Sequence, residues 1–197
     1  MRARLVVTFA LLSLLCAGCG ADDVVRIRID MKADRSATLH VSSLLMQEGP
    51  GPMEAGAKGV TWNERAVLQT SAGTVADLDG MTLDDITFRT GTTDTGLGFV
   101  SVTLPRGDSA KWFRKLAPSR EDRTRVQKTF DPTETFGKVG YAVKFELLLP
   151  GVVGGNGVHP RGRGVVVDAE KHKAILLVPI DAMIVDDGVM TWDVAWR

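Results

Sequence analysis

The chain has 197 residues, of which 44% are hydrophobic and 24% charged, as is typical of one globular domain with a sizeable core. Its 24 Lys and Arg residues balance 24 Asp and Glu residues, so the sequence lacks the basic excess expected of a nucleic-acid-binding domain. Both cysteines, Cys16 and Cys19, lie near the N-terminus, which excludes a disulfide or a cysteine-ligated metal site in the rest of the chain.

The N-terminus has the three parts of a secretory signal. Arg2 and Arg4 supply positive charge, and residues 5–15 form an apolar stretch that is too short to span a bilayer as a helix. The small residues directly before Cys19 resemble a bacterial lipobox. The stretch departs from the usual pattern in having Cys16 where leucine is common, three positions before the lipidated cysteine.

This resemblance implies cleavage before Cys19 and attachment of fatty acyl chains such as palmitate to that residue. We therefore divide the chain into a signal peptide at residues 1–18, a lipid-anchored tether at 19–23 and a single domain at 24–197. The expected location is the bacterial cell envelope, on the extracytoplasmic side of the plasma or outer membrane. An uncleaved signal-anchor and a secreted protein without lipid are the alternatives.

Two antiparallel hairpins are predicted in the first half of the domain. Residues 24–31 and 38–42 alternate apolar and polar side chains on either side of a turn at 34–36. Residues 86–89 and 98–104 have strand patterns and are joined by a glycine-containing link, which favours a second hairpin.

Short helices are predicted in the middle of the chain. Residues 110–116 are compatible with a helix that Asp108 or Ser109 caps. Residues 119–128 resemble another helix, with acidic residues in its first turn. Residues 60–69 are ambiguous, because part of the stretch has helical spacing although it is short.

Further strands are predicted at 139–149, 164–168, 174–180 and 189–196. Asp-Gly at residues 187–188 is a tight-turn signal between the last two of them. Together these patterns predict an α+β domain, built on a mainly antiparallel sheet with two short helices. The alternative is an all-β sandwich.

The glycine-rich stretch at residues 151–164 is the most unusual loop. Its backbone N–H groups, together with Arg161 and Arg163, would suit contact with an anion. The P-loop pattern is absent, however. We therefore favour a flexible connection between strands, with a turn at Asn156 and Gly157.

Basic and aromatic residues interleave within residues 111–128. On a protein tethered close to a bilayer, Lys111, Trp112, Arg114 and Lys115 would suit contact with anionic headgroups. The alternative, which we favour, is a solvated helix face whose aromatic rings lie in the core.

No catalytic or metal-binding motif is present. His40, His159 and His172 lack the spacing of metal ligands, and the G-x-S-x-G pattern of an esterase nucleophile does not occur. We therefore predict no catalytic residue, no metal and no cofactor, although a catalytic triad assembled from distant positions stays open.

The order of parts resembles bacterial lipoproteins with an LppM-like domain. The matching residues are Cys19, the opening strand at 25–41, Leu-Pro-Gly at 149–151 and the late strand at 190–196. The chain differs from the mycobacterial members in having no C-terminal membrane span. The resemblance implies an α+β domain that holds a lipid or another apolar ligand, and it implies no catalytic residue.

The first functional hypothesis is therefore a non-enzymatic envelope lipoprotein that is anchored to the membrane by its N-terminal lipid. Its domain would bind an apolar ligand, such as a lipid, or a partner protein, and no nucleic acid. The alternatives are a hydrolase of envelope polymers, working through paired carboxylates, and a purely structural envelope module. Two carboxylates facing each other across a cleft would favour the hydrolase.

Overall fold

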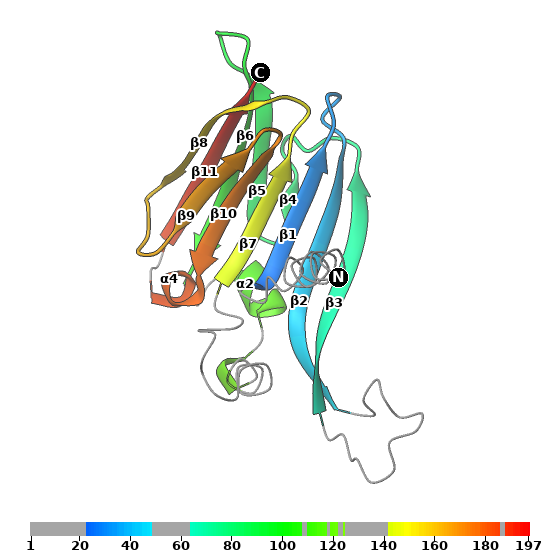
Figure 1. The fold of residues 1–197 in the computed structure, drawn as a ribbon, viewed down its shortest axis with the longest axis vertical. Helices are drawn as coiled ribbons and strands as arrows, with labels where there is room; N and C mark the ends of the chain where they lie inside the picture. The colour runs from blue at the N-terminus through cyan, green and yellow to red at the C-terminus, as the bar shows by residue number, and fades with distance from the viewer. Residues whose placement is uncertain are drawn as a thin grey trace, which may run out of the picture.

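Within the described residues the chain forms two β-sheets that face each other, with short helices at one end (Figure 1). The structure is a computed structural model, and it describes residues 23–48, 64–107, 110–117, 119–121, 124, 142–185 and 188–197.

The larger sheet has six strands in the order β3-β2-β1-β7-β10-β9. Neighbouring strands run antiparallel except β1 and β7, which pair in parallel. The strands are β1 (Asp23–Met31), β2 (Ala37–Glu48), β3 (Glu64–Val75), β7 (Ala142–Leu148), β9 (Val166–Glu170) and β10 (Lys173–Pro179).

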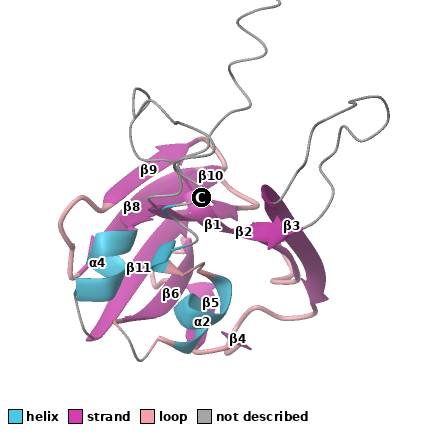
Figure 2. Cartoon of the chain, turned by 90° about the horizontal axis from the view of Figure 1, so that it is seen from below, coloured by secondary structure: helices cyan, strands magenta, loops and turns pink. Residues whose placement is uncertain are grey.

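The smaller sheet has five antiparallel strands in the order β4-β5-β6-β11-β8. Helix α2 (Lys111–Leu116) follows β6, and helix α4 (Ile180–Val185) connects the two sheets; both lie at the same end of the molecule (Figure 2). The strands are β4 (Thr82–Leu83), β5 (Ile86–Thr92), β6 (Gly98–Arg106), β8 (Val153–His159) and β11 (Gly188–Trp196).

One hydrophobic core fills the space between the sheets. Alternate residues of β1, such as Ile27 and Ile29, are almost fully buried, as period-two spacing requires of a strand with one face toward the core. The largest buried side chains are Trp112, Phe145 and Trp192. Burying each such ring removes about 150–250 Å² from water and makes the core the main source of stability.

Both predicted hairpins are confirmed. β1 pairs with β2 around the turn that contains Asp34, and β5 pairs with β6. The later predicted strands also form, as β7, β9, β10 and β11. The mainly antiparallel sheet structure with two short helices is confirmed, and the dominance of strands fits the all-β sandwich alternative better than the α+β class.

The helical spacing at residues 60–69 was misleading, because the described part of this stretch belongs to a strand. β3 pairs with β2 from Glu64 opposite Glu48 to Val75 opposite Ala37. Continuous cross-strand pairing therefore decides the conformation, and a short apolar pattern cannot reveal it. The predicted helix at 119–128 falls largely outside the described residues.

The tight turn predicted at residues 187–188 lies partly outside the described residues, and the strands on either side of it are not paired with each other. β10 belongs to the six-stranded sheet and β11 to the five-stranded sheet, so the chain crosses from one sheet to the other. Helix α4 makes this crossing and buries Ile180, Ala182 and Met183 against the core. Asp187 lies outside the described residues, while Gly188 begins β11.

The prediction of a flexible connection at 151–164 is also wrong, because its first half is the edge strand β8. Asn156 is not in a turn. It pairs with Val194 of β11, and its Oδ1 atom accepts a hydrogen bond of 2.7 Å from the buried Trp192 Nε1. The sequence of this glycine-rich edge strand does not alternate apolar and polar residues, so the sequence does not predict a strand there. Only the pairing of β8 with β11 in the structure shows that it is one.

Helix α2 is capped differently from the prediction. Ala110 occupies the N-cap position and its side chain makes no capping bond, while Asp108 and Ser109 lie outside the described residues. The carboxylate of Asp85, directly before β5, accepts the N–H groups of Lys111 at 2.8 Å and Trp112 at 2.9 Å. A residue distant in sequence therefore satisfies the free donors at the start of the helix.

Candidate functional site

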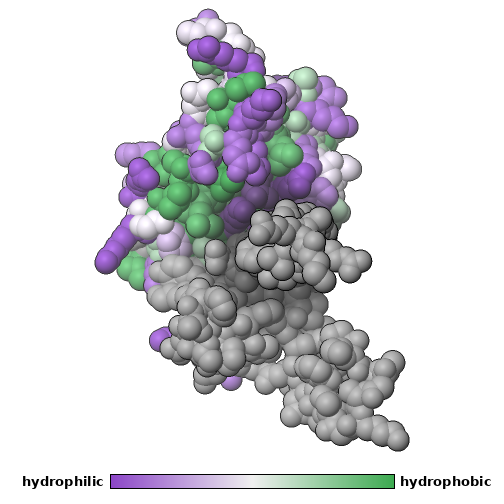
Figure 3. Space-filling model, in the orientation of Figure 1, coloured by the Kyte–Doolittle hydropathy of each residue, from purple (hydrophilic) through white to green (hydrophobic). Residues whose placement is uncertain are grey.

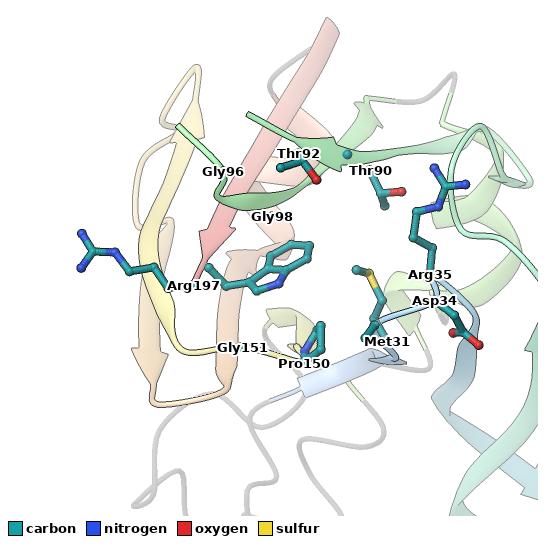
Figure 4. A pocket seen from close by; sticks show the side chains of 13 residues that line it. Met31, Asp34, Arg35, Thr90, Thr92, Gly96, Gly98, Pro150, Gly151 and Arg197 are labelled. Atoms are coloured by element: carbon teal, nitrogen blue, oxygen red, sulfur yellow. The ribbon is translucent and has the colours of Figure 1, made fainter. Parts of the chain in front are cut away.

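A cleft of about 640 Å³ opens at the end of the sandwich where β1 finishes (Figure 4). We call it the distal cleft, because it lies at the opposite end of β1 from Asp23, the first residue that the structure describes. Figure 4 shows Met31 and Pro150 on one side of it and Thr90 and Thr92 on the other. The β1–β2 turn, the β5–β6 hairpin, the segment after β7 and the end of β11 contribute the lining.

Trp196, at the end of β11, is the aromatic residue of the cleft. Its indole ring lies against two glycines, Gly98 of β6 and Gly151 after β7. A Cβ atom would lie 2.5 Å from the indole Cζ2 if added to Gly98, and 2.5 Å from the indole Cδ1 if added to Gly151. Because any side chain at either position would overlap the ring, the two glycines allow the indole to pack directly on the backbone.

Thr90 has an unsatisfied hydroxyl that is buried in the wall of the cleft. This residue of β5 is only 7% exposed, and its Oγ1 atom has no hydrogen-bond partner among the described residues. Its side chain points into the cleft (Figure 4), while its backbone N–H donates to Asp79 Oδ1 at 2.8 Å. A buried hydroxyl without a partner costs about 1–3 kcal/mol, so a ligand that supplies one gains that energy.

Two of the charged residues of the cleft, Asp34 and Arg35, lie in the β1–β2 turn, and the third, Arg197, follows β11. Asp34 Oδ1 accepts hydrogen bonds from the Ser36 hydroxyl at 2.7 Å and the Ser36 N–H at 3.0 Å. The hydroxyl first, and the N–H second, lower the pKa of Asp34, so this carboxylate stays ionised at neutral pH. Arg35 Nη2 contacts Asp77 Oδ2 at 2.9 Å, and both side chains are about half exposed.

The lining is mixed, and its polar surface is larger than its apolar surface. Its apolar part comes from the Trp196 ring, Met31 and Pro150, and its polar part includes Arg35 and Arg197 besides Asp34 and the threonines. Asp34 is the only carboxylate side chain among the lining residues. The volume of the cleft lies in the range of about 300–1,000 Å³ that is typical of small-molecule sites, while its lining is more polar than that of most such sites. The arrangement suits an amphipathic ligand.

Trp112, one of the predicted membrane contacts, is a core residue. It is fully buried, its ring packs edge-on against Phe113 and Phe145, and its Nε1 donates to Pro105 O at 2.9 Å. The prediction that Trp112 touches headgroups is therefore wrong. Trp112 alternates with basic residues because α2 is a helix with one face in the core and the other in solvent. The alternative interpretation, with the aromatic rings in the core, is confirmed for Trp112 and Phe113.

The predicted basic contacts lie at the opposite end from the distal cleft. Lys111, Arg114 and Lys115 are exposed on α2, and Lys115 pairs with Asp84 at 3.1 Å. The other two, Arg161 and Arg163, are exposed in the turn between β8 and β9, and none of the five lines the cleft.

The remaining predicted positions do not form a site in the described structure. Cys19 lies outside the described residues. The histidines do not gather, and no group of potential metal ligands forms among the described residues. No described helix is long and apolar enough to cross a bilayer.

The outer face of the six-stranded sheet carries charged side chains and a hydrophobic area (Figure 3). Its charges are paired within the sheet: Arg28 Nε contacts Asp30 Oδ1 at 2.7 Å, which raises the pKa of Arg28, and Lys144 Nζ contacts Glu146 at 3.0 Å. Exposed Val166 adds a hydrophobic area over β9. Because its charged groups pair with one another, this face is a weaker candidate for a binding site than the distal cleft.

The residues that form the distal cleft were not identified from the sequence. Thr90, Gly98, Gly151 and Trp196 are distant from one another in the chain, and each had an ordinary structural interpretation there. Comparison with known proteins adds no further guide to the site: no family model, no curated protein and no solved structure matches this chain.

Proposed function

We propose that this protein is a lipid-anchored lipoprotein of the bacterial envelope that binds a small amphipathic ligand in its distal cleft. The ligand would place an apolar group on Trp196 and a hydrogen-bonding group at Thr90. The anchor is supported by the lipobox pattern before Cys19, and the ligand site by the structure of the cleft. The proposal keeps the non-enzymatic hypothesis and narrows the class of ligand.

The observation that carries the ligand proposal is the unpartnered Thr90 hydroxyl in the wall of the distal cleft. Buried polar groups in folded proteins nearly always have partners, and those without one need an explanation. Here Thr90 lines an open cleft while its Oγ1 atom is closed off from solvent, so a small shift of the cleft lining on binding would bring a ligand group to it. A carbonyl, hydroxyl or amide group of a ligand would serve as the partner.

Binding is better supported than hydrolysis by the groups that line the cleft. Hydrolysis of a glycosidic bond by acid–base chemistry uses two carboxyl groups on either side of the bond. Among the residues that line the cleft, Asp34 supplies the only carboxylate side chain, and its hydrogen bonds to Ser36 favour the ionised form. An ionised carboxylate cannot donate a proton to a leaving group.

The position of the cleft also bears on where its ligand would come from. β1 spans nine residues from Asp23 to Met31, so the cleft lies about 26 Å from the tether at about 3.3 Å per residue. With Cys19 in the bilayer, this end of the domain would face the envelope space. The ligand would therefore be one that is exposed outside the bilayer or passed on by another envelope component.

Native mass spectrometry of the protein purified from its own membranes tests this proposal. We expect a non-covalent ligand on the wild-type protein and a bound fraction that falls in a Thr90→Val variant, which keeps the shape but removes the hydroxyl. Loss of about 1 kcal/mol corresponds to a roughly fivefold weaker affinity. Thr87→Val is the matched control, because Thr87 is exposed on the same strand and does not line the cleft.

Equal ligand occupancy in the Thr90→Val and Thr87→Val variants would contradict the role of Thr90. A wild-type protein that carries no ligand, and that gains none from an extract of envelope lipids and glycans, would contradict the binding proposal as a whole.

A further inference from the structure

An apolar surface lies at the end of the molecule opposite the distal cleft. Five large hydrophobic side chains are exposed within the described residues, and three of them gather where α4 leads into β11. Ile184 is 39% exposed, Val185 78% and Val189 51%. We call these three residues the α4 surface.

The α4 surface is held rigidly against the sandwich. Helix α4 buries Ile180, Ala182 and Met183, so its remaining side chains are directed away from the core. The Gly107 N–H donates to Met183 O at 2.8 Å, which joins the helix to the end of β6. Because α4 is packed on the core, Val185 could become buried within this chain only if α4 left the core.

The tether enters the domain at this same end. Asp23 pairs with Ala142, and Ala142 pairs with Pro179, so the three residues form one row across β1, β7 and β10. Strands lie about 4.8 Å apart, which places Pro179 about 10 Å from Asp23. Helix α4 begins at the next residue, Ile180 (Figures 1 and 2).

The length of the tether limits how far the α4 surface can stand from a bilayer. Cys19 and Asp23 are four residues apart, and a fully extended chain spans at most about 14 Å over that distance. This step rests on the proposed acylation of Cys19. If the acyl chains enter the bilayer, the row that begins at Asp23 must lie within about 14 Å of the headgroups, and α4 lies beside that row.

We infer that the α4 surface contacts the surface of the lipid bilayer in which the protein is anchored. This surface is apolar and lies at the end to which the tether is attached. The exposed cations Lys111 and Arg114 lie at this end on α2, whereas Asp181 is exposed on α4. Because the charges are mixed, the contact depends on apolar side chains more than on headgroup charge.

Fluorescence quenching by lipids tests this contact on the full-length, lipidated protein. In the mature protein the only native cysteine is Cys19, whose thiol would carry lipid, so an introduced cysteine can be labelled selectively. We would label Val185→Cys with a nitrobenzoxadiazole dye and reconstitute the protein in phosphatidylcholine vesicles that contain a headgroup-region quencher. Val152→Cys is the matched control, since Val152 is 47% exposed beside the distal cleft.

The expected result is at least twofold quenching at position 185 and little at position 152, unchanged when phosphatidylglycerol is added. Val189→Cys provides a second site on the same surface, in case labelling at 185 perturbs α4. Absence of quenching at both 185 and 189, on protein whose mass shows an acylated Cys19, would overturn this inference and leave the proposed anchor intact. If the mass of the protein shows no acyl chain on Cys19, both the anchor and the bilayer contact are wrong. If the dye is shielded from water but is not quenched by the lipid quencher, the α4 surface binds a protein partner instead.

Discussion

Replacing Asp85 with alanine should remove the cap of α2 and destabilise the domain. The Asp85 carboxylate accepts two backbone N–H groups, from Lys111 at 2.8 Å and from Trp112 at 2.9 Å. Loss of a capping side chain costs about 0.5–2 kcal/mol, and bonds to a charged acceptor lie toward the upper part of that range. The effect should be large here because α2 carries the fully buried Trp112.

We therefore expect Asp85→Ala to lower the free energy of unfolding by about 2 kcal/mol, measured by urea denaturation. For a chain of this size, about 2 kcal/mol corresponds to a decrease in Tm of about 4–8 °C. Lys115→Ala is the control, because Lys115 is 68% exposed and its pair with Asp84 is a surface ion pair worth at most about 1 kcal/mol. If both variants change stability by the same small amount, Asp85 does not hold α2 in the way described.

Two further predictions concern the distal cleft. Gly98→Ala should displace the Trp196 indole and lower the free energy of unfolding by about 1–3 kcal/mol, because it overpacks the site. The control variant Gly154→Ala, which has nothing within 4 Å of the added Cβ atom, should leave the free energy of unfolding almost unchanged. Equal stability of the two variants would contradict the packing of the ring on Gly98. Ser36→Ala should raise the pKa of Asp34 toward its ordinary value of 3.8, because the lost hydroxyl bond favours the ionised form. Since folding lowers the pKa of Asp34, the ionised carboxylate contributes to stability above pH 3.8, and this contribution is lost as the pH falls through the lowered pKa. If NMR shows the same titration of the Asp34 carboxyl in the Ser36→Ala variant as in the wild-type protein, the Ser36 hydroxyl is not the cause of the shift.

The local patterns of the sequence predicted the strands that have one face in the core. In β1 the alternation of Val25, Ile27 and Ile29 with charged residues specifies which side is buried, and the structure agrees. The same method failed at β8, whose glycines show no alternation, and at β3, where pairing with β2 overrides a helical spacing. Periodicity describes one strand at a time, whereas these segments are strands because of their partners.

Which strands are neighbours could not be derived from the sequence in the same way. β1 pairs in parallel with β7, more than a hundred residues later, and α4 carries the chain from one sheet to the other. The distal cleft depends on this arrangement. It assembles the β5–β6 hairpin, the β1–β2 turn and the end of β11, so Thr90 and Trp196 have no shared signal in the sequence.

The most direct test of the account is the mass of the protein recovered from its own membranes, recorded first denatured and then under native conditions. The account predicts a chain that begins at Cys19 and carries acyl chains, with a non-covalent ligand whose occupancy falls in the Thr90→Val variant. A chain that keeps Met1, or that begins at Cys19 with a free thiol, would contradict the anchor. A ligand held equally by the wild-type protein and the variant would contradict the site.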